Sequence, residues 1–258
     1  MKKLLVVKIG GNVTDDNEKL HRFLEDFSQR KEEKILIHGG GQTLNMHLKK
    51  MGVEPKMVDG RRITDAETLD AAVMIYAGLT NKKIVSILQG KGVNALGLTG
   101  ADGNIIVAHK RPVADIDYGY VGDIDEVNFY RVSEFISRGM VPVFAPITHN
   151  KAGQLFNTNA DTIAAEVAIA ASSMYDVHLV YCFGLSGVME NDQLIESLTL
   201  NQYKEKKENG IISGGMFPKL HNAFRTLNNG VRKATICHYT ALNPWHKEEF
   251  VGTKLTLS

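Results

Sequence analysis

Two glycine-rich turns, each directly after an apolar run, are the stretches of this sequence most suited to chemistry. Lys8-Ile9-Gly10-Gly11 follows the apolar residues 4–7, and His38-Gly39-Gly40-Gly41 follows a second apolar run. Glycine allows the backbone to approach a ligand closely, so the N–H groups of such turns can face an anion. The ammonium group of Lys8 beside the first turn would strengthen the binding of negative charge. Taken alone, however, Gly10-Gly11 could equally be a tight connection between a strand and a helix.

Four charged or polar residues far from these turns extend the argument. Lys219 opens a helical segment, Asp161 and Asn157 belong to an Asn/Asp-rich loop, and Arg62 lies in a polar loop. Phosphoryl transfer requires mainly that two anions are positioned and that the charge developing between them is neutralised. Two lysines held by an aspartate can do this, while an arginine binds a carboxylate through two hydrogen bonds. Each residue also has a plain alternative, a solvated surface charge for Lys219 or Arg62 and a helix cap for Asn157.

Several catalytic patterns are absent from the chain, which narrows the classes of enzyme. There is no GxxxxGKS/T of P-loop enzymes, no GxGxxG in the first turn after a strand, and no HExxH, GxSxG or paired CxxC. None of the nine histidines has the spacing of metal ligands, and His38 is expected to be structural. We therefore predict no metal-binding residues in the protein itself.

The composition is that of an ordinary globular protein with a small-molecule ligand. Of the 258 residues 43% are hydrophobic and 23% are charged, and 30 basic against 29 acidic residues give a formal net charge of +1. No overall field therefore favours nucleic acid or a membrane surface. Residues 4–7 are too short for a signal peptide or a membrane span, and the two distant cysteines suit a reducing compartment. We expect a cytoplasmic protein.

The hydrophobic pattern predicts strands that alternate with helices along the chain. Such alternation favours an α/β fold with a largely parallel sheet covered on both faces. Ligands of these sheets bind at the carboxyl ends of the strands, which is where the glycine turns fall. Strands are expected at 4–7, 34–38, 94–98, 140–147, 177–183, 234–237 and 254–257, with a β-hairpin region between 105 and 124. Helices are expected at about 15–27, 44–51, 65–76, 84–90, 127–137, 162–173, 200–209, 218–227 and 244–250.

Seven short motifs follow one another in a specific order. They are KIGGN at 8–12, HGGGQ at 38–42, DGRRITD at 59–65, GLTGADG at 97–103, GYVGDI at 119–124, FNTNAD at 156–161 and SGGMFPK at 213–219. Together they resemble the acetylglutamate kinases of the amino acid kinase family, over nearly the whole chain. The resemblance implies ATP-dependent phosphorylation of the γ-carboxylate of N-acetyl-L-glutamate, which gives an acyl phosphate for arginine biosynthesis.

The resemblance also implies a fold and an assembly. The expected subunit is a three-layer αβα sandwich with a largely parallel central sheet that is continuous through two lobes. Residues 1–165 would form a lobe that binds the acylated amino acid and makes a homodimer, and residues 166–258 a nucleotide-binding lobe. The first strand is expected to begin at about residue 3, so we expect no amino-terminal helical extension of the kind found in arginine-inhibited hexameric relatives. We therefore expect a dimer with little inhibition by arginine.

The matching positions imply roles for five residues around the transferred phosphoryl group. Lys8 and Lys219 would stabilise the transition state, and Asp161 would orient both lysines. Gly10 and Gly11 would contact the phosphates that are being transferred. A γ-carboxylate is already ionised near neutral pH, with a reference pKa of about 4.3, so no general base is required.

Four further positions imply a binding site for the acceptor. Gly40 and Gly41 would hold the substrate and the phosphoryl group from the side opposite the first glycine turn. Arg62 with Asn157 would bind the α-carboxylate and the amide of the acylated glutamate.

The nucleotide site is implied by two apolar residues and shows one departure from the family. Ile211 and Met216 would form the walls of the adenine site, and Mg²⁺ would be carried by the phosphates of ATP. The family usually has a loop written roughly as T-D-V-x-G, where this chain has Phe183-Gly184-Leu185-Ser186-Gly187. Because Gly184 replaces the aspartate, nucleotide contacts at this point must be made differently.

Two alternatives to this function stay open. Arg62 and Asn157 would recognise the glutamate part that N-acetyl- and N-succinyl-L-glutamate share, so the acyl group is not fixed by the sequence. A non-catalytic sensor of an amino acid or a nucleotide could also use the same fold. The presence of Lys8, Lys219 and Asp161 together argues against a sensor.

Overall fold

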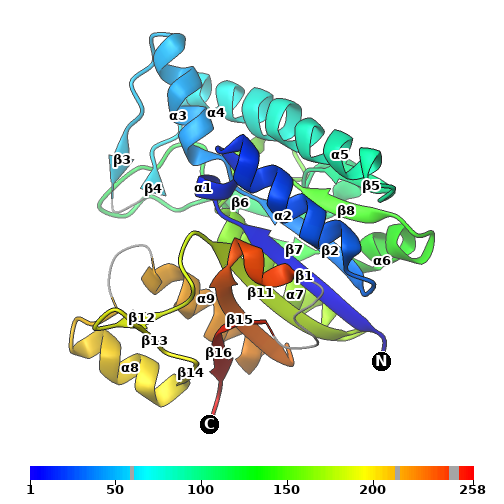
Figure 1. Cartoon of the computed structure of the whole chain (residues 1–258). Helices are drawn as coiled ribbons and strands as arrows, with labels where there is room; N and C mark the ends of the chain where they lie inside the picture. Colours follow the sequence, from blue (N-terminus) through cyan, green and yellow to red (C-terminus); the bar gives the residue numbers. More distant parts are fainter. Residues whose placement is uncertain (59–60, 213–215, 244–249) are drawn as a thin grey trace.

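A sheet of eight strands forms the centre of the molecule, for which the computed structural model describes residues 1–58, 61–212, 216–243 and 250–258. The strand order is β14-β16-β15-β11-β1-β2-β8-β5 (Figure 1). Neighbouring strands run parallel except β15 and β16, which are antiparallel. The strands are β1 (Lys3–Ile9), β2 (Glu33–His38), β5 (Ala95–Leu98), β8 (Val141–Phe144), β11 (Asp176–Phe183), β14 (Ser197–Thr199), β15 (Lys233–His238) and β16 (Gly252–Thr256).

Helices cover both faces of this sheet, which confirms the predicted three-layer αβα sandwich (Figure 1). The side chains of β1 alternate between two hydrophobic cores: Leu4 and Val6 join one, and Leu5, Val7 and Ile9 join the other. An apolar run without polar interruption is typical of a parallel strand that is buried on both faces. The first core is completed by α6 (Phe129–Ser137), α7 (Ala160–Ala171), α8 (Leu200–Glu208) and α9 (Met216–Asn228), and the second by α2 (Asn17–Gln29) and α5 (Asn81–Gly90).

A smaller four-stranded sheet, in the order β10-β9-β6-β7, packs beside the first core. Its antiparallel pair of β6 and β7 confirms the predicted hairpin region. The single strand expected at 140–147 is wrong, because the chain divides there between β8 of the large sheet and β9 of the small one. Pro146 lies at the break, where its missing N–H cannot continue a ladder. The strands are β6 (Ile106–Lys110), β7 (Gly122–Val127), β9 (Ile147–His149) and β10 (Leu155–Asn157).

One long helix replaces the two that were expected between residues 65 and 90. α4 (Ala66–Ala72) continues through a π-helical segment, η1 (Val73–Thr80), into α5. By length and composition this 25-residue helix is the one described helix that could cross a membrane, yet 44% of its most apolar window is buried inside the protein. π-Helical segments are rare in proteins, and those that occur are often found at functional sites. In this one, the side chain of Tyr76 packs against the second glycine turn.

The remaining elements are short, apart from the predicted helix α3 (Gly41–Lys50). The predicted helix at 244–250 falls almost entirely outside the described residues. Elements of two to four residues are too short to show a hydrophobic period in the sequence. They are α1 (Gly11–Thr14), β3 (Met57–Val58), β4 (Arg61–Arg62), η2 (Asp102–Asn104), β12 (Met189–Glu190), β13 (Gln193–Leu194) and η3 (Tyr239–Leu242).

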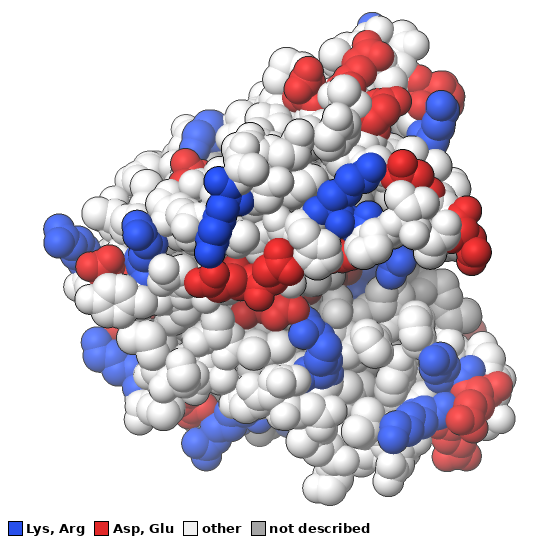
Figure 2. All heavy atoms as spheres, turned by 180° about the vertical axis from the view of Figure 1, so that it is seen from behind, with Lys and Arg blue, Asp and Glu red and all other residues white. Residues whose placement is uncertain are grey.

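Charged side chains of both signs are distributed over the surface. Figure 2 shows basic and acidic groups interspersed on the face seen from behind. This distribution agrees with the formal net charge of +1. The face therefore lacks a broad field of one sign, such as phosphate-backbone binding requires.

The packing around Gly122 predicts a loss of stability when a methyl group is added. A Cβ atom at this position would lie 2.7 Å from Thr158 Oγ1, 2.8 Å from Phe156 Cβ and 2.9 Å from Thr148 Oγ1. We expect Gly122→Ala to lower the free energy of unfolding by about 1–3 kcal/mol in urea denaturation, because a packed core must shift.

Gly90→Ala is the matched control for this substitution. Nothing lies within 4 Å of a Cβ atom at Gly90, at the end of α5, so this variant should be unchanged or more stable by up to about 1 kcal/mol. Equal stabilities of the two variants would contradict the packing argument.

Candidate active site

Two lysines and one aspartate from three separate elements meet in the interior of the protein. Lys8 Nζ lies 2.6 Å from Asp161 Oδ1, and Lys219 Nζ lies 3.4 Å from Asp161 Oδ2. The side chains of Lys8 and Asp161 are each 7% exposed and that of Lys219 is 21% exposed. The structure thus brings together the three residues for which a shared catalytic role was expected.

The electrostatics of this group favour ionised side chains that retain an excess of positive charge. Burial raises the pKa of Asp161, but the ammonium groups of Lys8 and Lys219 outweigh it, so the pKa lies below its usual value. Burial lowers the pKa of Lys8. The charge of Asp161 acts to raise this pKa, and the charge of Lys219 acts to lower it further. Within the three residues one positive charge is left over, which attracts an anion in a site of low dielectric constant.

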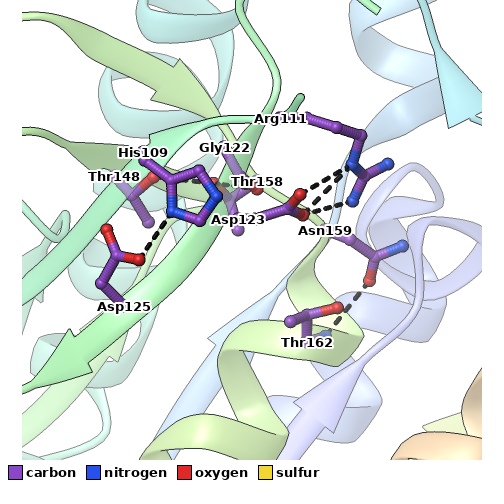
Figure 3. Close-up of polar contacts among 9 residues, drawn as sticks. All are labelled: His109, Arg111, Gly122, Asp123, Asp125, Thr148, Thr158, Asn159 and Thr162. Atoms are coloured by element: carbon purple, nitrogen blue, oxygen red, sulfur yellow. Dashed lines mark hydrogen bonds and ion pairs between the residues drawn. The ribbon is translucent and has the colours of Figure 1, made fainter. Parts of the chain in front are cut away.

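The position of Asp161 is fixed by hydrogen bonds of the backbone around it. Asn159 caps α7, because its Oδ1 accepts a hydrogen bond from the N–H group of Asp161 at 2.7 Å and another from that of Thr162 at 3.2 Å. Figure 3 shows the contact with Thr162. Tyr181 donates its hydroxyl proton to the carbonyl of Asp161 at 3.0 Å. Just before the cap, Thr158 shares a buried hydrogen bond of 2.7 Å with Thr148 (Figure 3). The carboxylate therefore stands on a rigid helix start.

The two glycine turns lie in contact with each other at the carboxyl ends of β1 and β2. A Cβ atom on Gly11 would lie 3.4 Å from the backbone nitrogen of Gly41, and one on Gly39 would lie 3.3 Å from that of Gly11. Gly40 has a φ of 149°, a conformation that residues with a side chain rarely adopt. The helices α1 and α3 begin at these turns without a side-chain cap from Gly10 or Gly40.

Asp15 connects the two turns and was not predicted from the sequence. Its Oδ1 accepts hydrogen bonds from both the backbone N–H and the hydroxyl of Thr43 in the first turn of α3. Gly40 has no side chain with which to cap α3. Asp15, which follows α1 just after the first glycine turn, makes this contact instead. No signal in the sequence identifies this contact, since the two residues are 28 positions apart.

The residues expected to bind the acceptor lie around the second turn. Arg62 is buried and donates from Nη2 to the carbonyl of Gly41 at 3.2 Å. Arg62 also lies beside the hydroxyl of Tyr76. Burial raises the pKa of this hydroxyl, although the positive charge of Arg62 acts to lower it. Asn157 donates from Nδ2 to Thr64 Oγ1 at 3.1 Å, two residues beyond Arg62. Tyr76 was missed in the sequence because it also fits an ordinary core position of a helix.

An apolar cavity adjoins the start of α9. Its volume is about 160 Å³, and it is lined by Ile211 and Met216 together with neighbouring apolar residues, Leu185, Gly187, Val188, Met189 and Ile212. Met216 begins the helix that carries Lys219 one turn later, so the cavity and the lysine are linked through one rigid element.

The side chain of Asn12 occupies the space beside Gly184, where the family pattern has an aspartate. A Cβ atom on Gly184 would lie 2.6 Å from Asn12 Nδ2, and one on Gly10 would lie 2.9 Å from Asn12 Oδ1. The amide of Asn12 therefore supplies the polar group at this point of the site.

A larger cavity, of about 390 Å³, lies at the opposite edge of the sheet. Its lining includes the first residues of three strands, Lys3, Asp176 and Lys233. In parallel sheets ligands bind at the carboxyl ends of the strands, which are the ends that carry the lysines and both glycine turns. The lysine-aspartate group is therefore the candidate active site, in preference to the larger cavity.

His38 precedes the second glycine turn and was expected to be structural. Among the described residues no group of three or more His, Cys, Asp or Glu side chains could hold a metal ion. His38 is fully buried, with Nδ1 2.8 Å from the carbonyl of Gly39 and Nε2 3.2 Å from Asn81 Nδ2. Burial lowers its pKa to about 4, so it is a neutral, structural residue at neutral pH.

Comparisons with known proteins agree on one family. The sequence profile of the amino acid kinase family matches residues 3–238. Acetylglutamate kinase from Cytophaga hutchinsonii is 48% identical over 99% of both chains. Acetylglutamate kinase from Phocaeicola vulgatus is 49% identical over 93% of this chain and 95% of the relative.

Solved structures show the same fold. A protein from Streptococcus mutans has a TM-score of 0.82 at 26% identity, with 99% of both chains covered. N-acetylglutamate synthase from Neisseria gonorrhoeae, in complex with coenzyme A and N-acetyl-glutamate, has a TM-score of 0.84 at 24% identity, over 98% of this chain and 59% of that one.

The buried ion pairs predict a large loss of stability when Asp161 loses its charge. Asp161→Asn leaves the ammonium groups of Lys8 and Lys219 without their counter-ion, which should lower the free energy of unfolding by about 3–5 kcal/mol at pH 7. The loss should shrink as the pH rises toward the usual lysine pKa of about 10.4, because the folded variant can then release a proton from Lys8 more easily. Urea denaturation at several pH values measures both effects.

Glu166→Gln on the same helix is the control. It removes an ion pair of 2.6 Å with Arg225, whose partners are 24% and 34% exposed, and should cost about 1 kcal/mol or less. A loss for Asp161→Asn no greater than that for Glu166→Gln would show that the buried group is not held by charge.

Proposed function

The chain belongs to the amino acid kinase family, and we infer that it is an enzyme that phosphorylates the γ-carboxylate of N-acetyl-L-glutamate with ATP. The product is the acyl phosphate N-acetyl-L-glutamyl 5-phosphate, which serves arginine biosynthesis. The observation that carries this inference is the buried group of Lys8, Asp161 and Lys219 at two touching glycine turns. Relatives that are 48–49% identical over nearly the whole chain are acetylglutamate kinases.

The two lysines address the main barrier of this reaction. A γ-carboxylate is ionised near neutral pH and needs no base, but it is repelled by the triphosphate of ATP. Lys8 from β1 and Lys219 from α9 place positive charge where the two anions meet, and Asp161 holds both ammonium groups in position. Because these charges are fixed before the substrates bind, they cost little reorganisation in the transition state.

The glycine turns are proposed to bind the phosphates from two sides. Gly10 and Gly11 would present backbone N–H groups to the phosphate of the nucleotide, and Gly40 and Gly41 would do so from the acceptor side. The contact between the two turns, fixed by Asp15, supports this arrangement. Helix starts in such turns favour negative charge.

Arg62 and Asn157 are proposed to bind the glutamate part of the acceptor. Arg62 already contacts Gly41 and is buried, so its guanidinium group can pair with the α-carboxylate without leaving the site. Asn157 offers an amide that can pair with the amide of the substrate.

The apolar cavity is proposed to receive the adenine ring of ATP. Ile211 and Met216 line it, and such a surface fits a flat apolar base. Mg²⁺ would reach the site on the phosphates of ATP, where it would neutralise their charge. In this arrangement residues 1–165 form the acceptor lobe and residues 166–258 the nucleotide lobe.

The assembly and the location are also proposed. The long helix exposes Met74 at 53% and Leu79 at 49%, apolar surface that a second copy of the chain could cover. We propose a homodimer, which size-exclusion chromatography with light scattering would test. The thiols of Cys182 and Cys237 are free and buried, as suits a cytoplasmic enzyme.

The function is tested by ADP release that depends on the acceptor. The purified protein is incubated with ATP and Mg²⁺ and with N-acetyl-L-glutamate, N-succinyl-L-glutamate or L-glutamate in turn. We expect the highest kcat/KM with N-acetyl-L-glutamate. Preference for N-succinyl-L-glutamate would show that it is the substrate in place of the acetyl compound. If none of the three acceptors stimulates ADP release, the result would support a non-catalytic sensor.

The lysines give the next prediction. Lys8→Ala and Lys219→Ala should each lower kcat by roughly 100- to 1,000-fold, as the loss of one charge-stabilising contact typically does. Circular dichroism should show an intact fold, because Asp161 keeps one lysine partner in either variant. Lys2→Ala, which removes a surface lysine paired with Glu33, should leave turnover unchanged. Near wild-type turnover of both site variants would refute the assigned roles.

A further inference from the structure

The aromatic ring of Phe183 lies next to both lysines of the active site. Lys8 Nζ is 5.3 Å and Lys219 Nζ is 4.9 Å from the centre of this ring. The face of an aromatic ring carries negative charge density and attracts an ammonium group within about 6 Å. One ring therefore faces the same two cations that Asp161 holds as ion pairs.

The ring is fixed from several directions. Phe183 is 6% exposed and ends β11, where it stacks on Tyr181 with ring centres 6.2 Å apart and planes inclined by 10°. Tyr181 in turn donates to the backbone of Asp161. A Cβ atom on Gly10 would lie 3.2 Å from Phe183 Cδ1, so the first glycine turn also packs on the ring.

Negative potential in addition to that of Asp161 favours the protonated form of both lysines. Two ammonium groups share one carboxylate, and burial together with the charge of Lys219 lowers the pKa of Lys8. Tyr181 and Cys182 add no negative charge beside the lysines, because burial raises the pKa values of both groups well above their usual range and keeps them neutral. His38, whose pKa burial lowers to about 4, is also uncharged at neutral pH. Glu166, which also acts on Tyr181, is paired with Arg225.

We propose that Phe183 is a positioning residue whose ring keeps Lys8 and Lys219 protonated and oriented, and so extends the activity of the enzyme to higher pH. The ring attracts the charged form of a lysine and has no comparable attraction for the neutral amine. The proposal rests on the proposed kinase function for its catalytic consequence.

The test first removes the aromatic ring and then, in separate proteins, lowers the negative charge density on the ring face while its shape is kept. In Phe183→Leu the attraction is lost, and the pKa of at least one of the two lysines should fall by roughly one unit. Proteins with mono-, di- and trifluorinated phenylalanine at position 183 should show the shift in steps, because each fluorine withdraws charge from the ring face. NMR titration of ¹³C-labelled lysine in the free enzyme measures these values without turnover.

The same series is then assayed with ATP and N-acetyl-L-glutamate. The alkaline limb of kcat/KM should move to lower pH by the same amounts, since less of the protonated lysine remains at a given pH. Fluorination of Phe224 is the control and should leave both readouts unchanged. This ring lies in α9 and stacks on Tyr203 of α8.

The outcomes separate the two claims. Lysine pKa values that do not change through the fluorinated series would overturn the role of Phe183, whatever the activity. A stepwise pKa shift in a protein that shows no acceptor-dependent turnover would support the ring and refute the kinase function. If Phe183→Leu does not fold, the fluorinated proteins still decide the question, because their side chains keep the shape of phenylalanine.

Discussion

One buried carboxylate between two ammonium groups is the interaction on which this structure depends. Taking an ion out of water costs several kcal/mol, and only a partner at close range repays that cost. Asp161 meets this requirement for Lys8 and Lys219 at once, although the three residues come from β1, α7 and α9. A small shift of any of these elements would leave a buried charge without its partner. The central position of β1 between β11 and β2, and the cap on α7, can be understood as the means of preventing that shift.

Much of this fold follows from patterns that are local in the sequence. Continuous apolar runs predict buried parallel strands, and their alternation with amphipathic helices predicts the layered sandwich, because each strand must bury two faces. The first glycine turn and Lys8 could be singled out because they follow an apolar run, at the carboxyl end of a strand where ligands of parallel sheets bind. The turn alone fits a plain connection between a strand and a helix equally well. The sequence therefore locates the edge of the sheet at which chemistry takes place.

What the sequence could not predict depends on contacts between distant residues. The proposed role of Lys219 cannot be predicted from its own helix, because a solvated surface lysine would give the same local pattern. The resemblance to a family suggested that role. Asp15 and Phe183 lie in ordinary local settings and become informative only when the turns and the lysines are placed beside them. The division of the strand at Pro146 and the fusion of two helices into one have the same origin, because tertiary packing decides both.

The repulsion between the two lysines also links protonation to ligand binding. In the free protein the shared carboxylate leaves one positive charge. Burial is the main cause that lowers the pKa of Lys8, and the charge of Lys219 adds to it against the influence of Asp161. A bound phosphate or carboxylate supplies negative charge at the same place, so it must raise the pKa values of the lysines. By linkage, protonation must then strengthen the binding of the anion by the same factor. The aromatic face of Phe183 reduces the cost of holding the protonated lysines before the anion arrives. It does so without the second carboxylate that would cancel their positive charge and repel the substrates.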